Sequence, residues 1–161
     1  IPFVNREGKH TALSLRGMRG EALRYVLVKI DEDAPTVFGL DYVDENSPIT
    51  VVEGPLDSLF IENSIACAGT SFNKIDELNL PKENMTIVFD NQPKNTDVCR
   101  LMQKYIKLGY KICIWPENIA GKDINDMVID GMEQSEIQQV IKNNTYKGLQ
   151  AEMKFATWRK C

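Results

Sequence analysis

The chain has 161 residues, of which 43% are hydrophobic and 26% charged, enough to bury the core of one domain with or without a small appendage. No apolar run reaches about 18 residues, so we expect no membrane-spanning segment. The chain starts at Ile1 with no methionine and no charged leader, and we expect a piece of a longer protein, not a processed secreted chain.

The cysteines are dispersed and form no C-x-x-C pair; they are Cys67, Cys99, Cys113 and Cys161. His10 is the only imidazole, and this argues against a zinc site in this chain. Cys67 and Cys113 lie within apolar runs and are interpreted as small core residues. Such cysteine usage is typical of a reducing cytoplasm, where we place the protein.

The net charge of −4 is unevenly distributed. Residues 1–30 contain six basic and two acidic side chains, a local charge of +4, which leaves −8 for residues 31–161. A basic surface beside an acidic pocket suits a metal-dependent enzyme that acts on a polyanion. Ordinary solvated surfaces would give the same distribution, so charge alone leaves both interpretations open.

The first part of the chain, residues 1–46, is predicted to be a small β-rich basic subdomain. Residues 1–4 and 11–15 are expected to form two strands joined by a turn, and residues 25–30 a third strand. The loop D-E-N-S-P at residues 44–48 is the clearest boundary before the next unit.

The second unit, residues 47–131, is predicted to be an α/β layer. Apolar β-branched runs at residues 49–52, 85–89 and 111–115 indicate buried strands. Asn95 is expected to cap a helix that runs to about residue 108 between the last two of these strands. Strand, helix and strand in this order predict a right-handed crossover between parallel strands.

Acids follow each of these three strands: Glu53 and Asp57 the first, Asp90 the second, and Asp123 and Asp126 the third. Ligands bind at the carboxyl ends of the strands in open α/β sheets. Clustered carboxylates raise each other's pKa, and a divalent cation removes that penalty. Oxygen ligands alone select Mg²⁺ or Mn²⁺ over zinc, so the acids predict a magnesium or manganese site.

The last part, residues 132–161, is predicted to be a helical segment. Its tail, residues 146–158, shows an apolar stripe that includes Leu149 and Met153, while Phe155 and Trp158 lie off the stripe. These two aromatic residues either bind another domain or cover the core, and we favour the core.

The ordered motifs E-G-x-x-D at residues 53–57, Asp90, and K-D-x-N-D at residues 122–126 resemble the Toprim domain of primases and topoisomerases. Further segments are similar to the catalytic region of bacterial-type DNA primases, and most similar to those of T-even-like bacteriophages, over about four fifths of the chain. These segments are residues 1–3, 15–17, 24–25, 37–40, 53–58 and 122–127. The resemblance implies a Toprim fold: a mostly parallel central sheet flanked by helices, with a small N-terminal β subdomain and C-terminal helices. Topoisomerase is disfavoured because the upstream segments match primases.

The resemblance also implies an activity: nucleotidyl transfer that joins ribonucleoside triphosphates into short RNA primers on a single-stranded DNA template, with Mg²⁺ or Mn²⁺. It implies a hexameric replicative helicase as a partner, and we expect this chain to be a monomer. Glu53 matches the glutamate proposed in the family as general base or metal ligand, and Asp90 matches the leading acid of the metal-binding pair. Arg16 and Arg24 match basic residues that hold template or nucleotide phosphates, a role that suits the guanidinium fork. Lys122 would meet a triphosphate, and an ion pair with Asp123 is the alternative.

Two positions depart from the family pattern. Gln92 stands where the family has the second acid of Asp-x-Asp, and Asn125 stands where bacterial primases usually carry an acid. An amide oxygen brings no charge, so we expect weaker metal binding and leave the number of metals open. Two other functions therefore remain: a Toprim nuclease, which uses the same acids to cleave, and a non-catalytic Toprim scaffold that binds helicase or DNA.

Overall fold

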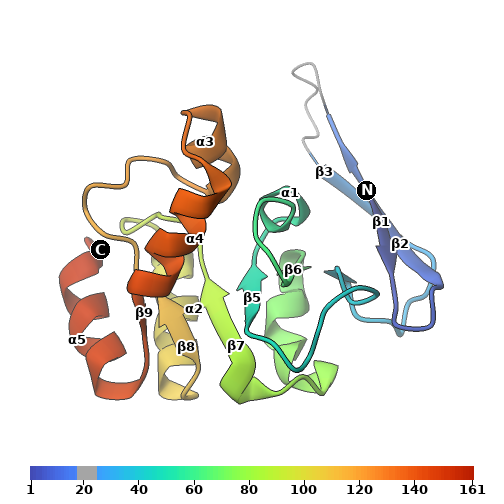
Figure 1. The fold of residues 1–161 in the computed structure, drawn as a ribbon. Coiled ribbons are helices and arrows are strands. Elements are labelled where there is room, and N and C mark those ends of the chain that lie inside the picture. Colours follow the sequence, from blue (N-terminus) through green and yellow to red (C-terminus); the bar gives the residue numbers. More distant parts are fainter. Residues whose placement is uncertain (18–24) are drawn as a thin grey trace.

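The computed structural model describes residues 1–17 and 25–161. The first three strands form a small antiparallel sheet, in the order β1-β2-β3, beside the larger body of the molecule (Figure 1). They are β1 (Pro2–Val4), β2 (His10–Arg16) and β3 (Tyr25–Lys29). The expected N-terminal strands are therefore confirmed.

The small sheet is attached to the rest of the chain by ring and ion contacts. The Phe3 and Phe38 rings meet edge to face with centroids 6.0 Å apart. Arg6 forms an ion pair of 2.8 Å with Glu45 and donates a hydrogen bond of 3.2 Å to the Leu78 carbonyl. These contacts connect the basic N-terminal region to the larger sheet.

Within the described residues the larger sheet has six strands in the order β4-β6-β5-β7-β8-β9. The four inner strands are parallel, and the edge strands β4 and β9 are antiparallel to their neighbours. The strands are β4 (Val37–Phe38), β5 (Ile49–Val52), β6 (Ser64–Cys67), β7 (Met85–Val88), β8 (Lys111–Cys113) and β9 (Thr145–Tyr146). After β5 the chain forms β6 on one side of β5 and then crosses to form β7 on the other side. The connection from β5 therefore runs to one side of the sheet and the connection from β7 to the other, so the strand order reverses between β5 and β7. Such a switch point opens a crevice at the carboxyl ends of the strands.

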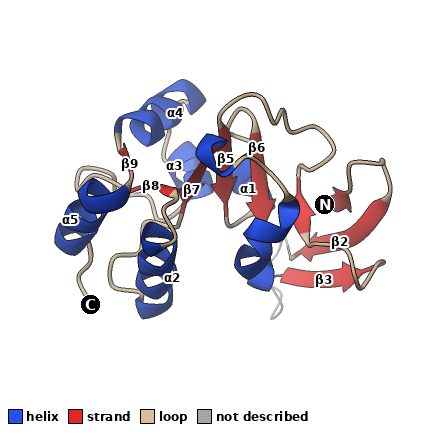
Figure 2. Ribbon diagram, turned by 90° about the horizontal axis from the view of Figure 1, so that it is seen from below, coloured by secondary structure: helices blue, strands red, loops and turns tan. Residues whose placement is uncertain are grey.

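Helices cover both faces of this sheet (Figure 2). They are α1 (Pro55–Ser58), the 3₁₀ helices η1 (Gly69–Leu78) and η2 (Lys82–Asn84), α2 (Thr96–Lys107), α3 (Ile124–Ile129), α4 (Gln134–Asn143) and α5 (Gly148–Trp158). Neighbouring strand residues point to opposite faces: Val51 joins the core under η1, α2 and α5, and Val52 joins the core under α3 and α4. The predicted mixed α/β fold, with a mostly parallel sheet flanked by helices, is confirmed. No helix of the described residues is both long and apolar enough to cross a membrane.

Helix α2 has the ends that the sequence predicts. The Asn95 side chain accepts hydrogen bonds from the backbone N–H groups of Asp97 and Val98 and so caps the helix. At the other end, Gly109 adopts φ +80°, a conformation that glycine tolerates and that stops the helix.

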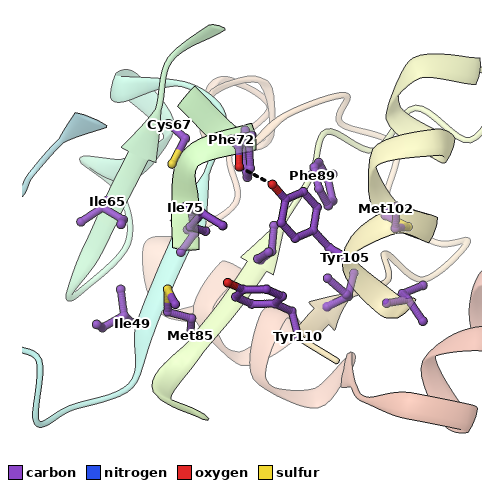
Figure 3. Close-up of a cluster of buried hydrophobic side chains, with 14 of the residues drawn as sticks. Ile49, Ile65, Cys67, Phe72, Ile75, Met85, Phe89, Met102, Tyr105 and Tyr110 are labelled. Carbon is purple, nitrogen blue, oxygen red and sulfur yellow. Dashed lines mark hydrogen bonds between the residues drawn. The ribbon is translucent and has the colours of Figure 1, made fainter. Parts of the chain in front are cut away.

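An aromatic cluster supports the end of strand β7 (Figure 3). The Phe89 ring stacks on Phe72 with centroids 5.2 Å apart and lies 6.1 Å from the Tyr105 ring. The Tyr105 hydroxyl donates a hydrogen bond to the Phe72 carbonyl and connects α2 to η1. Because Phe89 directly precedes Asp90, this packing holds the point at which the acid leaves the sheet.

The last part, residues 132–161, contains the two helices α4 and α5, but its tail differs at the start from the helix expected over residues 146–158. Tyr146 belongs to the short edge strand β9, and α5 starts only at Gly148. Phe155 and Trp158 are buried, as favoured. The predicted apolar stripe is wrong, because Leu149 is 71% and Met153 65% exposed. The division at residues 46/47 and 131/132 stays a prediction, although β4 pairs with the larger sheet from within residues 1–46.

Candidate active site

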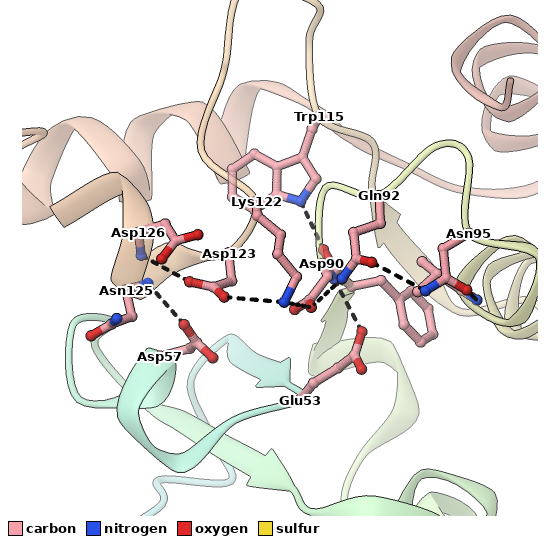
Figure 4. A network of polar contacts seen from close by, with 12 residues as sticks. Glu53, Asp57, Asp90, Gln92, Asn95, Trp115, Lys122, Asp123, Asn125 and Asp126 are labelled. Carbon is pink, nitrogen blue, oxygen red and sulfur yellow. Dashed lines mark hydrogen bonds and ion pairs between the residues drawn. The ribbon is translucent and has the colours of Figure 1, made fainter. Parts of the chain in front are cut away.

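Glu53 and Asp90 lie side by side at the switch point of the sheet (Figure 4). Strands β5 and β7 are paired in parallel with Val51 opposite Ile87, so both strands end at the same edge. The Asp90 backbone N–H donates a hydrogen bond of 3.1 Å to Glu53 Oε1. Register and hydrogen bond together fix the carboxylate of Glu53 beside the start of the Asp90 loop.

Asp57 reaches the same edge from α1, and Gly54 makes this possible. Pro55 opens the helix, and its missing N–H costs nothing at that position. A Cβ atom at Gly54 would collide with Asp57 Oδ2, so only glycine lets the Asp57 side chain fold back over the turn. Asp57 Oδ1 accepts a hydrogen bond of 2.8 Å from the Asn125 backbone N–H, which connects α1 to α3.

Asp123 is the N-cap of α3, and its Oδ1 accepts a hydrogen bond of 2.8 Å from the Asp126 backbone N–H. Asp126 itself lies in the first turn of α3, half-buried. Gly121 packs against α3: a Cβ there would lie 2.5 Å from Met127 Cγ and 3.1 Å from its backbone nitrogen. This close packing of the Gly121 loop against α3 places Asp123 at the edge of the sheet where the strands β5 and β7 end.

Lys122 lies between two of the acids. Its Nζ is 3.7 Å from Asp90 Oδ2 and 3.8 Å from Asp123 Oδ2. The ion pair that the sequence left as an alternative is therefore present, while contact with a triphosphate stays a prediction.

Gln92 stands where the family has a metal-binding acid. In this chain its side chain donates a hydrogen bond to Asp90. Its Nε2 donates a bond of 2.8 Å to Asp90 Oδ2, and its Oε1 accepts one of 3.1 Å from Asn95 Nδ2. The Asn95 Oδ1 atom is taken by the N–H groups at the start of α2. Because those N–H groups can only donate, they set the orientation of both amides, and the Gln92 NH₂ group faces Asp90.

Three residues that sequence reasoning missed support these loops. Asn91 donates from its backbone N–H to the Lys122 carbonyl at 2.7 Å, and its side chain donates to the carbonyls of Ile119 and Gly121. Trp158 Nε1 lies 3.4 Å from Asn91 Oδ1, and Trp115 Nε1 donates a 2.8 Å bond to the Phe89 carbonyl. The amide and the two indoles carry no distinctive sequence signal, since each acts through a distant partner.

The pKa values of Glu53, Asp57 and Asp90 are raised. Burial, and then the charge of Asp90, raise the pKa of Glu53 from 4.5 to about 7. Burial is also the main cause for Asp57, whose pKa rises to about 6, with the charges of Asp123 and Asp90 contributing. Burial raises the pKa of Asp90 as well, against the opposing effect of Lys122. The edge therefore resists full ionisation and would be relieved by a cation.

The donor chemistry of the edge fits a divalent cation of the magnesium type. No three acidic, histidine or cysteine side chains converge as a ready-made metal cluster in residues 1–17 and 25–161. Mg²⁺, however, usually takes only one or two protein carboxylates and completes its shell with water and substrate phosphates. In each of Glu53, Asp57, Asp90 and Asp123 one carboxylate oxygen is held by a backbone or amide N–H, and the other oxygen receives no such bond.

Arg16 belongs to the small sheet and not to the strand ends that carry these acids. Arg16 ends β2 of the small sheet and is exposed. Arg24 lies outside the described residues. Their roles in binding phosphates stay predictions.

None of the known family models matches the chain. The DNA primase of Enterobacteria phage T4 is 32% identical over 164 residues, which cover 99% of this chain and 47% of the relative. The chain thus spans about half the length of the curated relative it matches. The resemblance to DNA primases is confirmed.

Solved structures share the fold. The Aquifex aeolicus primase, with its zinc-binding and RNA polymerase domains, has a TM-score of 0.67 at 18% identity and covers 99% of this chain and 47% of its own. A primase catalytic domain bound to single-stranded DNA also has a TM-score of 0.67, at 13% identity, over 88% of this chain and 50% of its own. The Escherichia coli primase catalytic core has a TM-score of 0.66 at 12% identity, over the same 88% and 50%. The chain therefore has the fold of the bacterial primase catalytic cores.

Proposed function

We propose that this chain is the catalytic part of a DNA primase, a nucleotidyltransferase that makes short RNA primers on single-stranded DNA for phage DNA replication. The observation that carries the proposal is the meeting of Glu53 and Asp90 at the switch point, with Asp57 and Asp123 beside them, in a chain similar over 99% of its length to a DNA primase. Ligands bind at this place in open α/β sheets.

Glu53 and Asp90, with Asp57, Asp123 and Asp126 nearby, would hold one or more Mg²⁺ or Mn²⁺ ions through the carboxylate oxygens that bind no N–H group. A bound divalent cation supplies Lewis-acid stabilisation of the charge on the phosphate oxygens. The 3′-hydroxyl oxygen of one nucleotide attacks the α-phosphorus of the next, and pyrophosphate leaves. Glu53 Oε2 has one of two roles: it ligates the cation, or it leaves the cation to the aspartates and accepts the hydroxyl proton, a role for which a pKa of about 7 is suited because it lies near the working pH.

The chain is also proposed to have nucleic-acid, nucleotide and helicase partners. Arg16 and Arg24 bind template or nucleotide phosphates, and Lys122 binds the triphosphate, because guanidinium and ammonium groups donate to phosphate oxygens. The similar primase domain bound to single-stranded DNA supports a DNA template. We also propose that the protein acts in the host cytoplasm as a monomer with a hexameric replicative helicase.

Primer synthesis by variants tests the proposal. We expect Glu53→Gln and Asp90→Asn each to lower the rate of primer synthesis on single-stranded DNA by about 100-fold or more, because each removes a charged oxygen at the reacting phosphates. The control is Asp97→Asn, an exposed acid in the first turn of α2 that pairs with Arg100. Its rate should equal that of the unchanged protein.

The same assay separates the other functions. Normal primer synthesis by Glu53→Gln and Asp90→Asn would overturn the proposal. DNA cleavage without ribonucleotides, lost in both variants, would identify a nuclease. DNA or helicase binding with no metal dependence and no synthesis would identify a scaffold.

A further inference from the structure

We propose that Lys122 is an internal counter-ion of the site: a divalent cation displaces its ammonium group from Asp90 and Asp123, and the ammonium then binds the phosphates of a nucleoside triphosphate. The inference rests on the proposed function and adds to it a competition between a protein side chain and the metal. Its basis is the position of Nζ between carboxylates that come from two different strand ends (Figure 4).

The ammonium is held loosely. Its distances to the two carboxylates, 3.7 and 3.8 Å, are longer than the roughly 2.7–2.9 Å of a direct charged hydrogen bond. The Lys122 side chain is 56% exposed, whereas those of Asp90 and Asp123 are 19% and 22% exposed. The charge therefore lies on the solvent side of two largely buried acids, where it can leave without opening the core.

The backbone of Lys122 is fixed while its side chain is not. The Lys122 carbonyl accepts the 2.7 Å hydrogen bond from the Asn91 N–H, and the Asn91 amide holds the two carbonyls at Ile119 and Gly121. Four flexible methylene groups separate this anchor from the ammonium. The side chain can therefore swing about a fixed point from the acids to a bound phosphate.

Both acids keep their orientation when Lys122 leaves. Asp90 Oδ2 still accepts the 2.8 Å bond from Gln92, whose own orientation is set by the cap of α2. Asp123 Oδ1 still caps α3. Since other donors fix both carboxylates, the Lys122 ion pairs are not needed to build the site, and their effect is on its charge.

Lys122 should oppose the binding of a divalent cation when no nucleotide is present. A divalent cation that approaches Asp90 and Asp123 meets a positive charge already in place, so Lys122 weakens cation binding to the site without nucleotide. A triphosphate attracts the ammonium away and removes this opposition. Cation and nucleotide should therefore strengthen each other's binding, and by linkage the factor is the same in both directions.

Manganese binding to the 161-residue chain tests the inference. We expect Lys122→Gln to bind Mn²⁺ without nucleotide about 3- to 10-fold more tightly than the unchanged chain in calorimetry, because the competing charge is gone. Lys122→Arg keeps the charge, so its affinity should stay at or below that of the unchanged chain. Lys160→Gln removes a lysine that pairs with Glu117, at 3.4 Å, and should leave Mn²⁺ binding unchanged.

The second readout is the effect of a non-reactive ribonucleoside triphosphate analogue. It should increase Mn²⁺ affinity more in the unchanged chain than in Lys122→Gln. Mn²⁺ binding that is equal or weaker in Lys122→Gln, while Asp90→Ala loses it, would overturn this inference and leave the proposed function standing. Absence of Mn²⁺ binding in every variant, with and without the analogue, would overturn both.

Discussion

Glu53 should make the protein less stable as the pH rises, and Glu53→Gln should remove much of this effect. The pKa of Glu53 is about 7 in the folded chain and 4.5 when unperturbed. Between these values the folded state binds the proton more tightly than the unfolded state, so the free energy of unfolding falls as pH rises. The stabilisation from the neutral carboxyl is complete below pH 4.5 and is lost as the pH passes 7.

The magnitude follows from the same two pKa values. One pKa unit corresponds to about 1.4 kcal/mol, so the rise from 4.5 to about 7 sets a ceiling of about 3 kcal/mol on the stability lost between pH 4.5 and 8. Glutamine has the same shape and an oxygen that can still accept the Asp90 N–H bond, but it carries no charge. We therefore expect Glu53→Gln to be about 1–3 kcal/mol more stable than the unchanged chain at pH 8, and close to it at pH 4.5.

Urea denaturation at pH 4.5, 6, 7 and 8, with a chelator present, measures the difference. The control is Glu117→Gln, which neutralises an exposed acid whose ion-pair partner is Lys160, and it should keep the pH dependence of the unchanged chain. Two results would refute the assignment of this pH-dependent loss of stability to Glu53. Glu53→Gln could lose stability with rising pH as steeply as the unchanged chain, or it could be the less stable of the two at pH 8.

Other substitutions test neighbouring parts of the structure. Gly54→Ala places a Cβ against Asp57 Oδ2, so the Asp57 side chain has to turn away and give up its bond to the Asn125 N–H. The free energy of unfolding should fall by about 1 kcal/mol, and urea curves equal to those of the unchanged chain would contradict the packing at that turn. Gln92→Glu replaces the 2.8 Å donor to Asp90 with a second negative charge, so the melting temperature at pH 8 should fall without divalent cations and recover with Mn²⁺. A fall that Mn²⁺ does not reverse would contradict the contact between the side chains of residues 92 and 90. Met102→Ala empties a fully buried position of the core and should cost about 2–5 kcal/mol by the same urea measurement, with primer synthesis unchanged below the melting temperature; a cost under about 1 kcal/mol would contradict that burial.

The sequence predicted the parts of the fold that depend on local patterns. Apolar runs located the parallel strands β5, β7 and β8, and Asn95 located the start of α2. The switch point between β5 and β7 was not predicted, because it depends on which side of β5 each later strand joins. Strand β9 was missed for a similar reason: two residues form it only by pairing with β8.

In the site, too, local patterns were predicted and distant contacts were missed. The acids that follow the strands in the sequence are the residues that meet at the edge, and the ion pair of Lys122 with Asp123 was one of the two alternatives considered. The role of Gln92 was not predicted, because its side-chain orientation comes from the capped end of α2 three residues later. The indole of Trp158 reaches Asn91 from the end of α5, and no local pattern indicates this contact.

The edge formed by Glu53, Asp90 and Asp123 is proposed to bind a divalent cation for phosphoryl transfer. Anomalous scattering from crystals soaked in Mn²⁺, with and without a ribonucleoside triphosphate analogue, tests this binding most directly. We expect a manganese peak beside Glu53 and Asp90 that is absent from Asp90→Ala crystals. Manganese found only elsewhere, or found at this edge equally in Asp90→Ala, would contradict it.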